Sequence, residues 1–217
     1  MQLISLNVAQ PQLVLRDGRR YSTAINKQPV IGPLDLDTNG LAGDRPADGA
    51  HHGGPDKAVC CYPHEHYPYF AARLGTDRLA LPSFGENFTT SGLLENEVCI
   101  GDTFAVGQAV VQVTQPRDPC WKLAQKHHRR ELVQWVLQSQ FTGFYLRVLQ
   151  PGQITAGDKL RLLQRPHPQA TVASATIAMH AKPAAPQQIA KFRQLPELSA
   201  AWRGQFTERL AQIPFDG

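Results

Sequence analysis

The stretch Glu97–Gln115, EVCIGDTFAVGQAVVQVTQ, decides the fold class. Val and Ile dominate its apolar positions, and alternation is clearest over Ala109–Val113, as half-buried β-strands require. Gly101-Asp102 precedes a new apolar run here, and Gly157-Asp158 does the same in Gln153–Leu162, QITAGDKLRL. Gly-Asp pairs between apolar runs are typical of hairpin or corner turns. Both pairs are therefore interpreted as turns between strands.

Short β-type runs of this kind fill the chain as far as about Gln164. They are separated by Gly, Pro and Asp turns, and the amino terminus, Met1–Leu15, is typical of a first strand. Further runs lie at residues 28–31, 57–62, 143–150 and 158–164. Regular short strands divided by such turns predict a barrel or a sandwich.

Helical patterns interrupt and then follow these strands. One helix is expected around Tyr67–Leu74, and Pro119–Leu137 predicts one helix or two with a break near residues 127–130. The composition changes near residues 165–169, and Thr171–His180, Pro186–Arg193 and Leu198–Ile213 predict three short helices. The fold class is therefore mostly β with helices in residues 1–165, followed by a small α-helical domain of three helices in residues 166–217.

The composition limits the kinds of partner. The chain has 217 residues, a formal charge of +4 and a pI near 9.0, which favours an anionic ligand. It shows no interleaving of basic and aromatic residues and no helix-turn-helix pattern, so a phosphorylated small ligand is expected and nucleic acid is not. No apolar run reaches the length of a membrane span. The amino terminus has no signal-peptide pattern, so we expect a cytoplasmic protein without a membrane partner.

Four cysteines occur without CxxC or zinc-type spacing, and we expect free thiols. Cys60, Cys61 and Cys99 lie in apolar strand-like runs and are interpreted as small core residues. Cys120 is different, because Asp118 is a good helix N-cap and Pro119 suits the first helical position. A thiol in a first helical turn, close to Arg117, is expected to be partly thiolate. Spacing alone leaves Cys120 open between a reactive thiolate and an inward-packed hydrophobe.

Two further segments could bind a ligand. The Gly-rich segment Asn39–Val59 carries Arg45, His51, His52 and Lys57, and a loop of this length is uncommon in a compact domain unless it has a function. Its glycine amides could hold an anion.

The segment Ser83–Leu93 contains Glu86 and Asn87, which could point into a cleft or simply form a turn. The pair His127-His128 is expected on a solvated helix face, and His64 with His66 at a helix start.

Taken in order, these motifs resemble the MOSC family, the carboxy-terminal domain of molybdenum cofactor sulfurases. The resemblance covers roughly residues 1–164, and the three-helix tail resembles the small domain of the YiiM-like branch of that family. The residues that carry it are Gly43-Asp44, His51-His52-Gly53-Gly54, Lys57-Ala58-Val59, Phe84-Gly85-Glu86-Asn87, Ile100-Gly101-Asp102, Pro116-Arg117-Asp118-Pro119-Cys120, Gly143-Phe144-Tyr145, Arg147-Val148-Leu149 and Gly157-Asp158.

The resemblance implies a β-barrel-containing fold and a pyranopterin molybdenum cofactor. In relatives such as the mitochondrial amidoxime-reducing component, the family cysteine ligates molybdenum, and by position in the motif that cysteine is Cys120. The implied activity is reduction of N-hydroxylated small molecules, such as 6-hydroxylaminopurine-type base analogues and amidoximes. The other implied cofactor-binding residues are Arg45, His51, His52, Gly53, Gly54, Lys57, Glu86, Asn87, Arg117 and Asp118.

The chain carries no flavin fingerprint and no cysteine cluster for iron–sulfur, so a separate flavin or iron–sulfur reductase is expected to supply electrons. One alternative is a sulfur carrier that bears a persulfide on Cys120 for cluster or cofactor maturation. Another is a cofactor-binding or storage protein without turnover. The sequence leaves the physiological substrate and the oligomeric state open.

Overall fold

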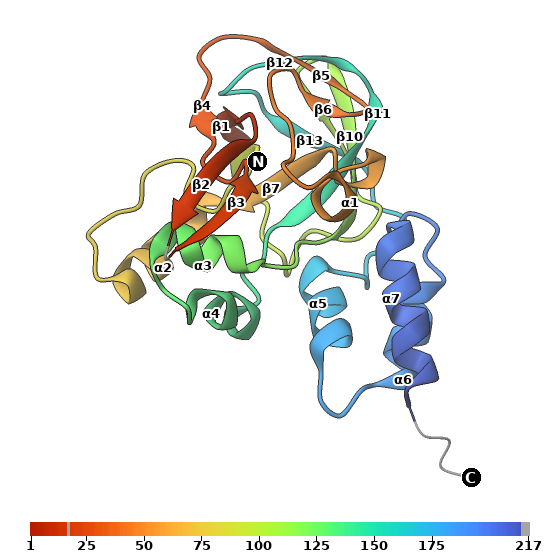
Figure 1. Cartoon of the computed structure of the whole chain (residues 1–217). Helices are drawn as coiled ribbons and strands as arrows, with labels where there is room; N and C mark the ends of the chain where they lie inside the picture. Colours follow the sequence, from red (N-terminus) through yellow and green to blue (C-terminus); the bar gives the residue numbers. More distant parts are fainter. Residues whose placement is uncertain (17, 214–217) are drawn as a thin grey trace.

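A computed structural model describes residues 1–16 and 18–213. Its main sheet has the strand order β13-β9-β10-β11-β7-β8-β1-β4, and every neighbouring pair is antiparallel except β7 and β8. The strands are β1 (Gln2–Val8), β4 (Gln28–Pro29), β7 (Val59–Pro63), β8 (Phe88–Ser91), β9 (Thr103–Val106), β10 (Ala109–Pro116), β11 (Phe144–Gln150) and β13 (Leu160–Gln164). The fold is mostly β in this part, as predicted (Figure 1).

The sheet closes into a barrel because β1 returns to the start of β13. The Leu3 amide donates to the Asp158 carbonyl at 2.9 Å, and the Leu160 amide donates to the Met1 carbonyl at 3.1 Å. Inward-facing residues such as Leu3, Val111 and Leu146 are buried and form the barrel core. Closure satisfies the edge groups that an open sheet would leave unpaired.

The two Gly-Asp pairs are turns that precede strands, as predicted. Gly101 has φ +86° and Gly157 has φ +102°, a backbone region that favours glycine. Each aspartate then accepts a hydrogen bond from the amide three residues earlier: Asp102 from Cys99 at 2.9 Å and Asp158 from Thr155 at 2.8 Å. The turn chemistry accounts for both repeats.

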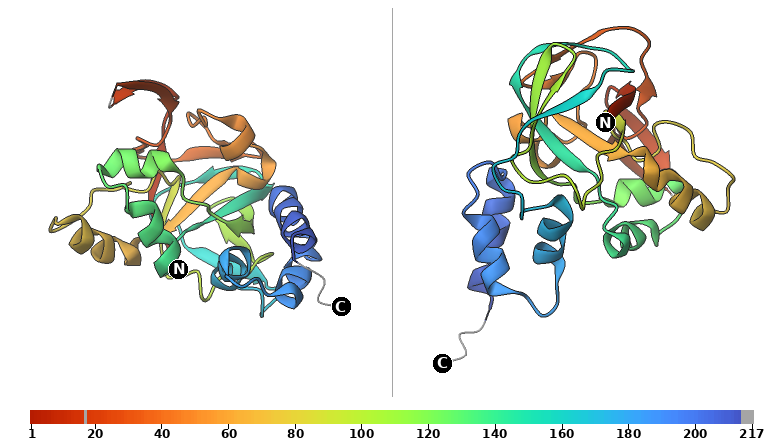
Figure 2. Two further views of the ribbon diagram at one scale, coloured as in Figure 1. Left: turned by 60° about the horizontal axis from the view of Figure 1, so that its bottom comes forward. Right: turned by 180° about the vertical axis from the view of Figure 1, so that it is seen from behind.

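The amino terminus forms a first strand, as predicted, but this strand does not extend to Leu15. β1 ends at Val8, and the chain then forms a separate hairpin of β2 (Gln12–Arg16) and β3 (Arg19–Thr23). This hairpin projects from the body of the molecule (Figure 2). Its alternating apolar residues therefore do not all reach a core, and Leu13 is 71% exposed.

A third small sheet is antiparallel and has the order β12-β5-β6, from β12 (Gly152–Ile154), β5 (Leu34–Asp37) and β6 (Gly40–Leu41). The expected long loop at Asn39–Val59 is more ordered than predicted. It contains the short helices α1 (Gly49–His52) and η1 (Pro55–Lys57) between β6 and β7.

Three helices lie outside the barrel beside a second apolar cluster. They are α2 (Tyr67–Leu74), preceded by η2 (His64–His66), α3 (Trp121–His127) and α4 (Leu132–Ser139). The break expected near residues 127–130 is present, because His128 ends α3 with a left-handed φ of +53°. Leu123 of α3 and Leu132 of α4 are fully buried in this cluster. The cluster therefore anchors the segment that follows Cys120.

The predicted three carboxy-terminal helices are α5 (Val172–His180), α6 (Pro186–Arg193) and α7 (Ala200–Ala211). Trp202 and Phe206 of α7 are fully buried, and the apolar cluster that contains them continues into the barrel core. The described helices are each too short to cross a membrane, and none combines the length and apolar character that a span needs.

Candidate functional site

Cys120 lies where β10 leaves the barrel and α3 begins. Asp118 was expected to cap this helix, but α3 begins at Trp121 and Cys120 itself is the N-cap residue. The Leu123 amide donates to the Cys120 carbonyl at 3.0 Å, which places the thiol just before the first helical turn. The Asp118 carboxylate instead contacts the His180 ring of α5 at 3.3 Å. Asp118 is therefore half-exposed and faces the helical domain.

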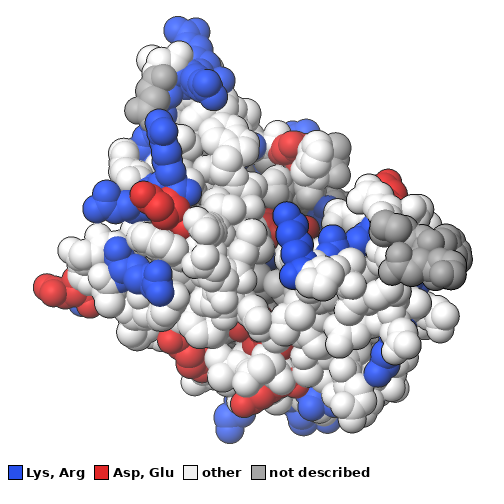
Figure 3. Space-filling view, turned by 90° about the horizontal axis from the view of Figure 1, so that it is seen from below, with Lys and Arg blue, Asp and Glu red and all other residues white. Residues whose placement is uncertain are grey.

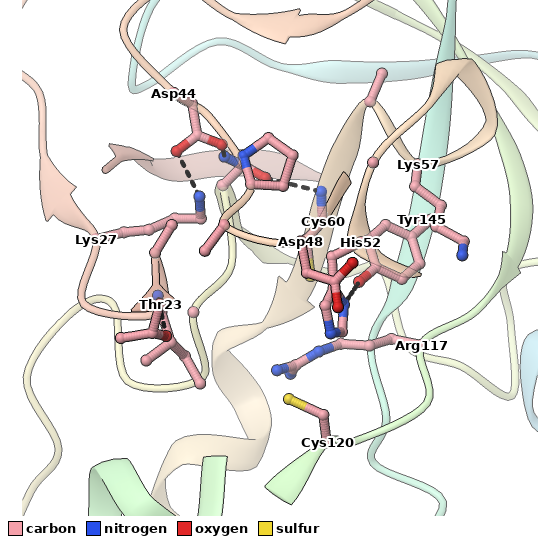
Figure 4. A pocket seen from close by; sticks show the side chains of 18 of the residues that line it. Thr23, Lys27, Asp44, Asp48, His52, Lys57, Cys60, Arg117, Cys120 and Tyr145 are labelled. Carbon is pink, nitrogen blue, oxygen red and sulfur yellow. Dashed lines mark hydrogen bonds and ion pairs between the residues drawn. The ribbon is translucent and has the colours of Figure 1, made fainter. Parts of the chain in front are cut away.

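The thiol of Cys120 faces an open cavity of about 120 Å³. Figure 4 shows the sulfur beside the guanidinium of Arg117, with His52 and Tyr145 above them. The other end of the cavity holds Thr23, Lys27 and Asp44. Residues from several separated segments of the barrel domain therefore line one cavity.

Arg117 is the main buried cation of the cavity. Its side chain is only 6% exposed, and Nη2 donates to the Phe84 carbonyl at 2.6 Å. Nη1 is buried and has no hydrogen-bond partner in the described part of the chain. A guanidinium stays protonated in proteins, so this end of the cavity carries a positive charge with an unsatisfied donor. An anionic group would satisfy it.

His52 and Tyr145 form a neutral edge next to this charge. Burial, followed by the nearby charges of Arg117 and Lys122, lowers the pKa of His52 from 6.5 to about 4. Burial raises the pKa of Tyr145 well above its usual value, so it stays a phenol. His52 Nδ1 and the Tyr145 hydroxyl are 3.4 Å apart. At pH 7 the imidazole is therefore neutral and can accept a hydrogen bond.

The opposite end of the cavity is a saturated polar network. Asp44 accepts hydrogen bonds from the Ala9 amide at 2.7 Å, from Lys27 and from Asn87 at 2.8 Å. Asn87 Oδ1 accepts from the Cys60 amide at 3.1 Å. Because each of these groups already has a partner, they stabilise the cavity wall and are not available to bind a charged ligand.

Most of the predicted site residues lie together. The cavity is lined by Cys120 and, among the other predicted cofactor contacts, by His52, Gly53, Gly54, Lys57, Asn87 and Arg117. The two glycines differ: a Cβ on Gly54, which has φ +90°, would meet no atom within 4 Å, whereas a Cβ on Gly53 would lie 2.9 Å from the Gly49 carbonyl oxygen. Figure 3 shows Lys and Arg side chains around a recess near the middle of one face and at the tip of the projecting hairpin.

Four predicted contacts lie elsewhere. Glu86 is fully buried and accepts hydrogen bonds from the Phe84 amide, Tyr67 and Thr89, so it stabilises the turn and does not line the cavity. Arg45 is exposed, and only its backbone is used, with its amide donating to the Ala9 carbonyl. His51 and Asp118 are absent from the cavity wall and line a neighbouring groove instead.

Sequence reasoning missed several lining residues, notably Lys27, Lys122 and Tyr145. Lys122 follows Cys120 by two residues, and this spacing could have drawn attention to it. Tyr145 belongs to the motif Gly143-Phe144-Tyr145, which could have drawn attention to it, whereas no local signal points to Lys27.

Among the remaining histidines, His66 was expected only at a helix start. It is buried and pairs with Glu95 at 2.6 Å. His127 is half-buried rather than solvated, with Nε2 2.8 Å from the Ser83 carbonyl. Cys60, Cys61 and Cys99 are buried as predicted, and burial raises the pKa of Cys60 to about 11.

The residues present fit an anionic cofactor that binds through a thiolate. Cys120 is the least buried cysteine and faces the cavity, and Arg117 keeps an unpartnered buried Nη1 beside it. Four cationic side chains line the cavity against the carboxylates of Asp44 and Asp48. The described residues contain no cluster of three His, Cys, Asp or Glu side chains that could hold a metal alone. A metal here would therefore need ligands from a cofactor as well as Cys120.

Comparison with known proteins assigns the family. The MOSC domain model matches residues 48–161, more than half of the chain. The chain belongs to the MOSC domain family. The model of the YiiM-like, 3-alpha helix domain matches residues 171–212, which include α5 to α7. The MOSC family is associated with binding of the molybdenum cofactor, and this agrees with the chemistry of the cavity.

Relatives of this MOSC protein match most of its length. The uncharacterized protein YflK of Bacillus subtilis is 42% identical over 207 residues, covering 95% of this chain and 93% of YflK. The crystal structure of YiiM from Geobacillus stearothermophilus superposes with a TM-score of 0.83 at 36% identity, covering 96% and 98% of the two chains. A protein named reductase from Gibberella moniliformis is 32% identical over 82% of this chain, which spans only 32% of that protein.

Proposed function

We propose that this MOSC protein is a molybdenum-cofactor-dependent reductase of N-hydroxylated small molecules, with Cys120 as the protein ligand to molybdenum. The observation that carries the proposal is the half-buried Cys120 thiol beside Arg117, whose buried Nη1 has no partner in the described residues. The family's association with the cofactor and a relative that is named a reductase support it.

The residues of the chain have distinct roles in this proposal. Arg117, Lys57 and Lys122 bind the cofactor's phosphate, since charge-assisted hydrogen bonds hold such groups most strongly. Gly54, whose missing side chain leaves open space, lets the ligand approach the backbone closely, and Gly53 allows the chain to pack against Gly49. When bound, the cofactor supplies two-electron chemistry that cleaves an N–O bond.

Neutral His52 accepts a hydrogen bond from the substrate, and phenolic Tyr145 donates one to it. The two side chains are neighbours at the cavity edge and together orient the polar end of the substrate. The overall reaction consumes two electrons and two protons, turns an N–OH group into N–H and releases water. The electrons come from a separate flavin or iron–sulfur reductase, because the sequence shows no flavin fingerprint and no cysteine cluster for iron–sulfur.

The test uses protein made in a host that synthesises the molybdenum cofactor. Native protein is expected to contain molybdenum and pterin and to reduce N-hydroxyadenine with a chemical reductant. Cys120→Ser is expected to abolish reduction, while Cys99→Ser, at a buried cysteine outside the cavity, retains it. Protein that carries no molybdenum and reduces no N-hydroxylated compound would refute the proposal.

The same protein preparations distinguish a reductase from a sulfur carrier. For a sulfur carrier, mass spectrometry of native protein would show a stable persulfide on Cys120 and no pterin. A storage protein would bind pterin through its phosphate contacts and would keep part of it in Cys120→Ser without turnover in either form.

A further inference from the structure

The projecting hairpin of β2 and β3 is attached to α3 by its inner face. Arg16 lies opposite Arg19 in the hairpin, and the Arg16 guanidinium donates to the Gln125 carbonyl of α3. The Tyr21 ring of β3 meets the Trp121 ring of α3 edge-on, at a centroid distance of 4.7 Å. The inner face therefore holds the hairpin in place beside the helix that follows Cys120.

The outer face of the hairpin is apolar and uncovered. Leu13 lies opposite Ser22 and Leu15 opposite Arg20, and opposite residues of an antiparallel pair share one face of the sheet. Leu15 is 66% exposed and Leu13 is more exposed still. A single exposed leucine is ordinary, but two on one face of a projecting hairpin indicate an interaction surface.

Arginines surround this apolar face. Arg16 also contacts the ring of His128, so the turn between α3 and α4 lies beside the tip of the hairpin. The basic patch formed in this way comprises Arg16, Arg19, Arg20, Arg129 and Arg130. Figure 3 shows the cations at the hairpin tip standing clear of the body of the molecule.

The charge of the basic patch is largely unbalanced. Residues 16–20 and 128–131 hold five arginines against two carboxylates, Asp17 and Glu131, which gives a formal charge of +3. Among residues 1–16 and 18–213, no arginine of the patch forms an ion pair with a carboxylate. These guanidinium groups are therefore available to a negatively charged partner.

The basic patch lies a short distance from the cavity. Thr23, at the inner end of β3, lines the cavity, and Arg19, at the outer end, is four residues away. A strand of four residues spans about 13 Å. A second connection runs through the paired rings, because Tyr21 follows Arg20 and Trp121 follows Cys120. A redox centre held over the patch would therefore lie near the thiol.

The composition of this surface favours a protein over a nucleic acid. Residues 12–23 and 128–131 contain arginines but no lysine, and protein interfaces are enriched in arginine and depleted in lysine. Binding to a nucleic acid backbone relies on charge and gains nothing from the exposed Leu13 and Leu15. A small patch of this kind suits the brief encounters of electron-transfer partners.

We infer that the outer face of the hairpin and the basic patch together dock the acidic face of an electron-donor protein. This inference rests on the proposed function, because it gives the separate flavin or iron–sulfur reductase its binding surface. The arginines pair with carboxylates of the donor, and Leu13 and Leu15 pack against apolar side chains between them. An iron–sulfur donor gives up one electron in each encounter and leaves oxidised. Two encounters then supply the two electrons that one N–OH reduction consumes.

Binding to cofactor-free protein tests the surface without catalysis. The probes are an acidic [2Fe–2S] ferredoxin and, in parallel, an acidic flavodoxin, each titrated at low and at high salt. At least one is expected to bind the wild type at low salt and to bind more weakly at high salt. Arg19→Glu with Arg20→Glu should weaken binding at low salt at least tenfold, because like charges then face each other.

A matched double variant separates the position of the charges from their number. Arg161→Glu with Arg193→Glu makes the same change of net charge at exposed positions on β13 and α6, and it should bind like the wild type. Leu15→Ser, which changes no charge, should weaken binding at both salt concentrations. Equal binding by the two double variants would overturn the inference, as would a wild type that binds neither probe. Hairpin-dependent binding to RNA or to anionic vesicles, without binding to either probe, would overturn it too.

Kinetics of the cofactor-loaded enzyme separate the docking surface from the proposed function. With the reduced probe as donor, Arg19→Glu with Arg20→Glu should slow reduction of N-hydroxyadenine at least tenfold, whereas the rate with dithionite stays that of the wild type. An unchanged donor-driven rate refutes the docking surface but leaves the proposed function intact. Hairpin-dependent binding of a probe, in a protein that reduces no N-hydroxylated compound even with dithionite, refutes the proposed function but supports the docking surface.

Discussion

Protonation of His52 should make the folded state less stable in mild acid. Burial, then Arg117 and Lys122, lower its pKa to about 4, whereas an unfolded chain has the ordinary value of 6.5. Between pH 6.5 and pH 4 the unfolded chain therefore binds a proton that the folded state does not. The stability contribution is fully present above pH 6.5 and is lost as the pH falls toward 4.

The size of the effect follows from the two pKa values of His52. Taken at face value, they correspond to about 3.4 kcal/mol in total and to about 2 kcal/mol between pH 7.5 and pH 5. The ring is only half-buried, so solvent screens part of this difference. We expect about 1 kcal/mol to remain.

The assay is urea unfolding at pH 7.5 and pH 5 for the wild type and His52→Asn. The wild type should lose about 1 kcal/mol more stability than the variant over this interval. Burial also lowers the pKa of His127, but His127 is present in both proteins, so its contribution to the loss of stability cancels in the comparison. His64→Asn, at an exposed histidine outside the cavity, should behave like the wild type. Equal losses in the wild type and His52→Asn would show that this imidazole is not held neutral by its surroundings.

Three further changes test other parts of the site and fold. Glu86→Gln should lower the free energy of unfolding by about 1–3 kcal/mol in urea, because it disturbs a buried acceptor of three hydrogen bonds; an unchanged value would contradict the buried network. Arg117→Met should lower the ratio of molybdenum to protein at least tenfold in elemental analysis, and normal loading would remove this residue from the cofactor site. Trp202→Ala should cost about 3–5 kcal/mol in urea, since it empties a fully buried position; a cost below 1 kcal/mol would mean that α7 is loosely packed.

The fold class could be predicted because its signals are local. Proline at the first helical position and apolar spacing predicted Pro186–Arg193 with the bounds that the structure shows. The Gly-Asp turns were predicted from the residue types alone, and the structure shows each aspartate accepting a hydrogen bond from the amide three residues earlier. The position of the boundary between residues 165 and 166 stays a prediction.

Errors arose where a distant contact decides the local structure. Asp118 and Pro119 form a good helix start by composition, but Asp118 contacts His180 and the helix begins at Trp121. Gln2–Val8 forms β1, yet the apolar residues that follow it pair with residues 19–23 instead of continuing that strand. Sequence spacing contains no information about such partners.

The errors at the candidate site have a simpler cause. Adjacent residues of a chain project their side chains in different directions, so two neighbours in one motif need not face the same cavity. Asn87 lines the cavity, and Glu86 turns into the buried network with Tyr67. His51 and His52 also differ: His52 lines the cavity, whereas His51 lines only the neighbouring groove. Considering the two sides of each motif separately would have narrowed the candidates.

The contribution of α7 to the groove beside the cavity could not be predicted from its own segment. Ala201 and Gln205 line this groove but are ordinary exposed helix residues, and nothing in their neighbours distinguishes them from Ala211. Their position follows from the barrel groups that fix the helix start, above all the Thr114 carbonyl, which directly precedes Gln115 in the chain. The same strand end thus anchors α7 and supplies Gln115, which also lines the groove. A displacement of α7 would therefore alter both walls of the groove together.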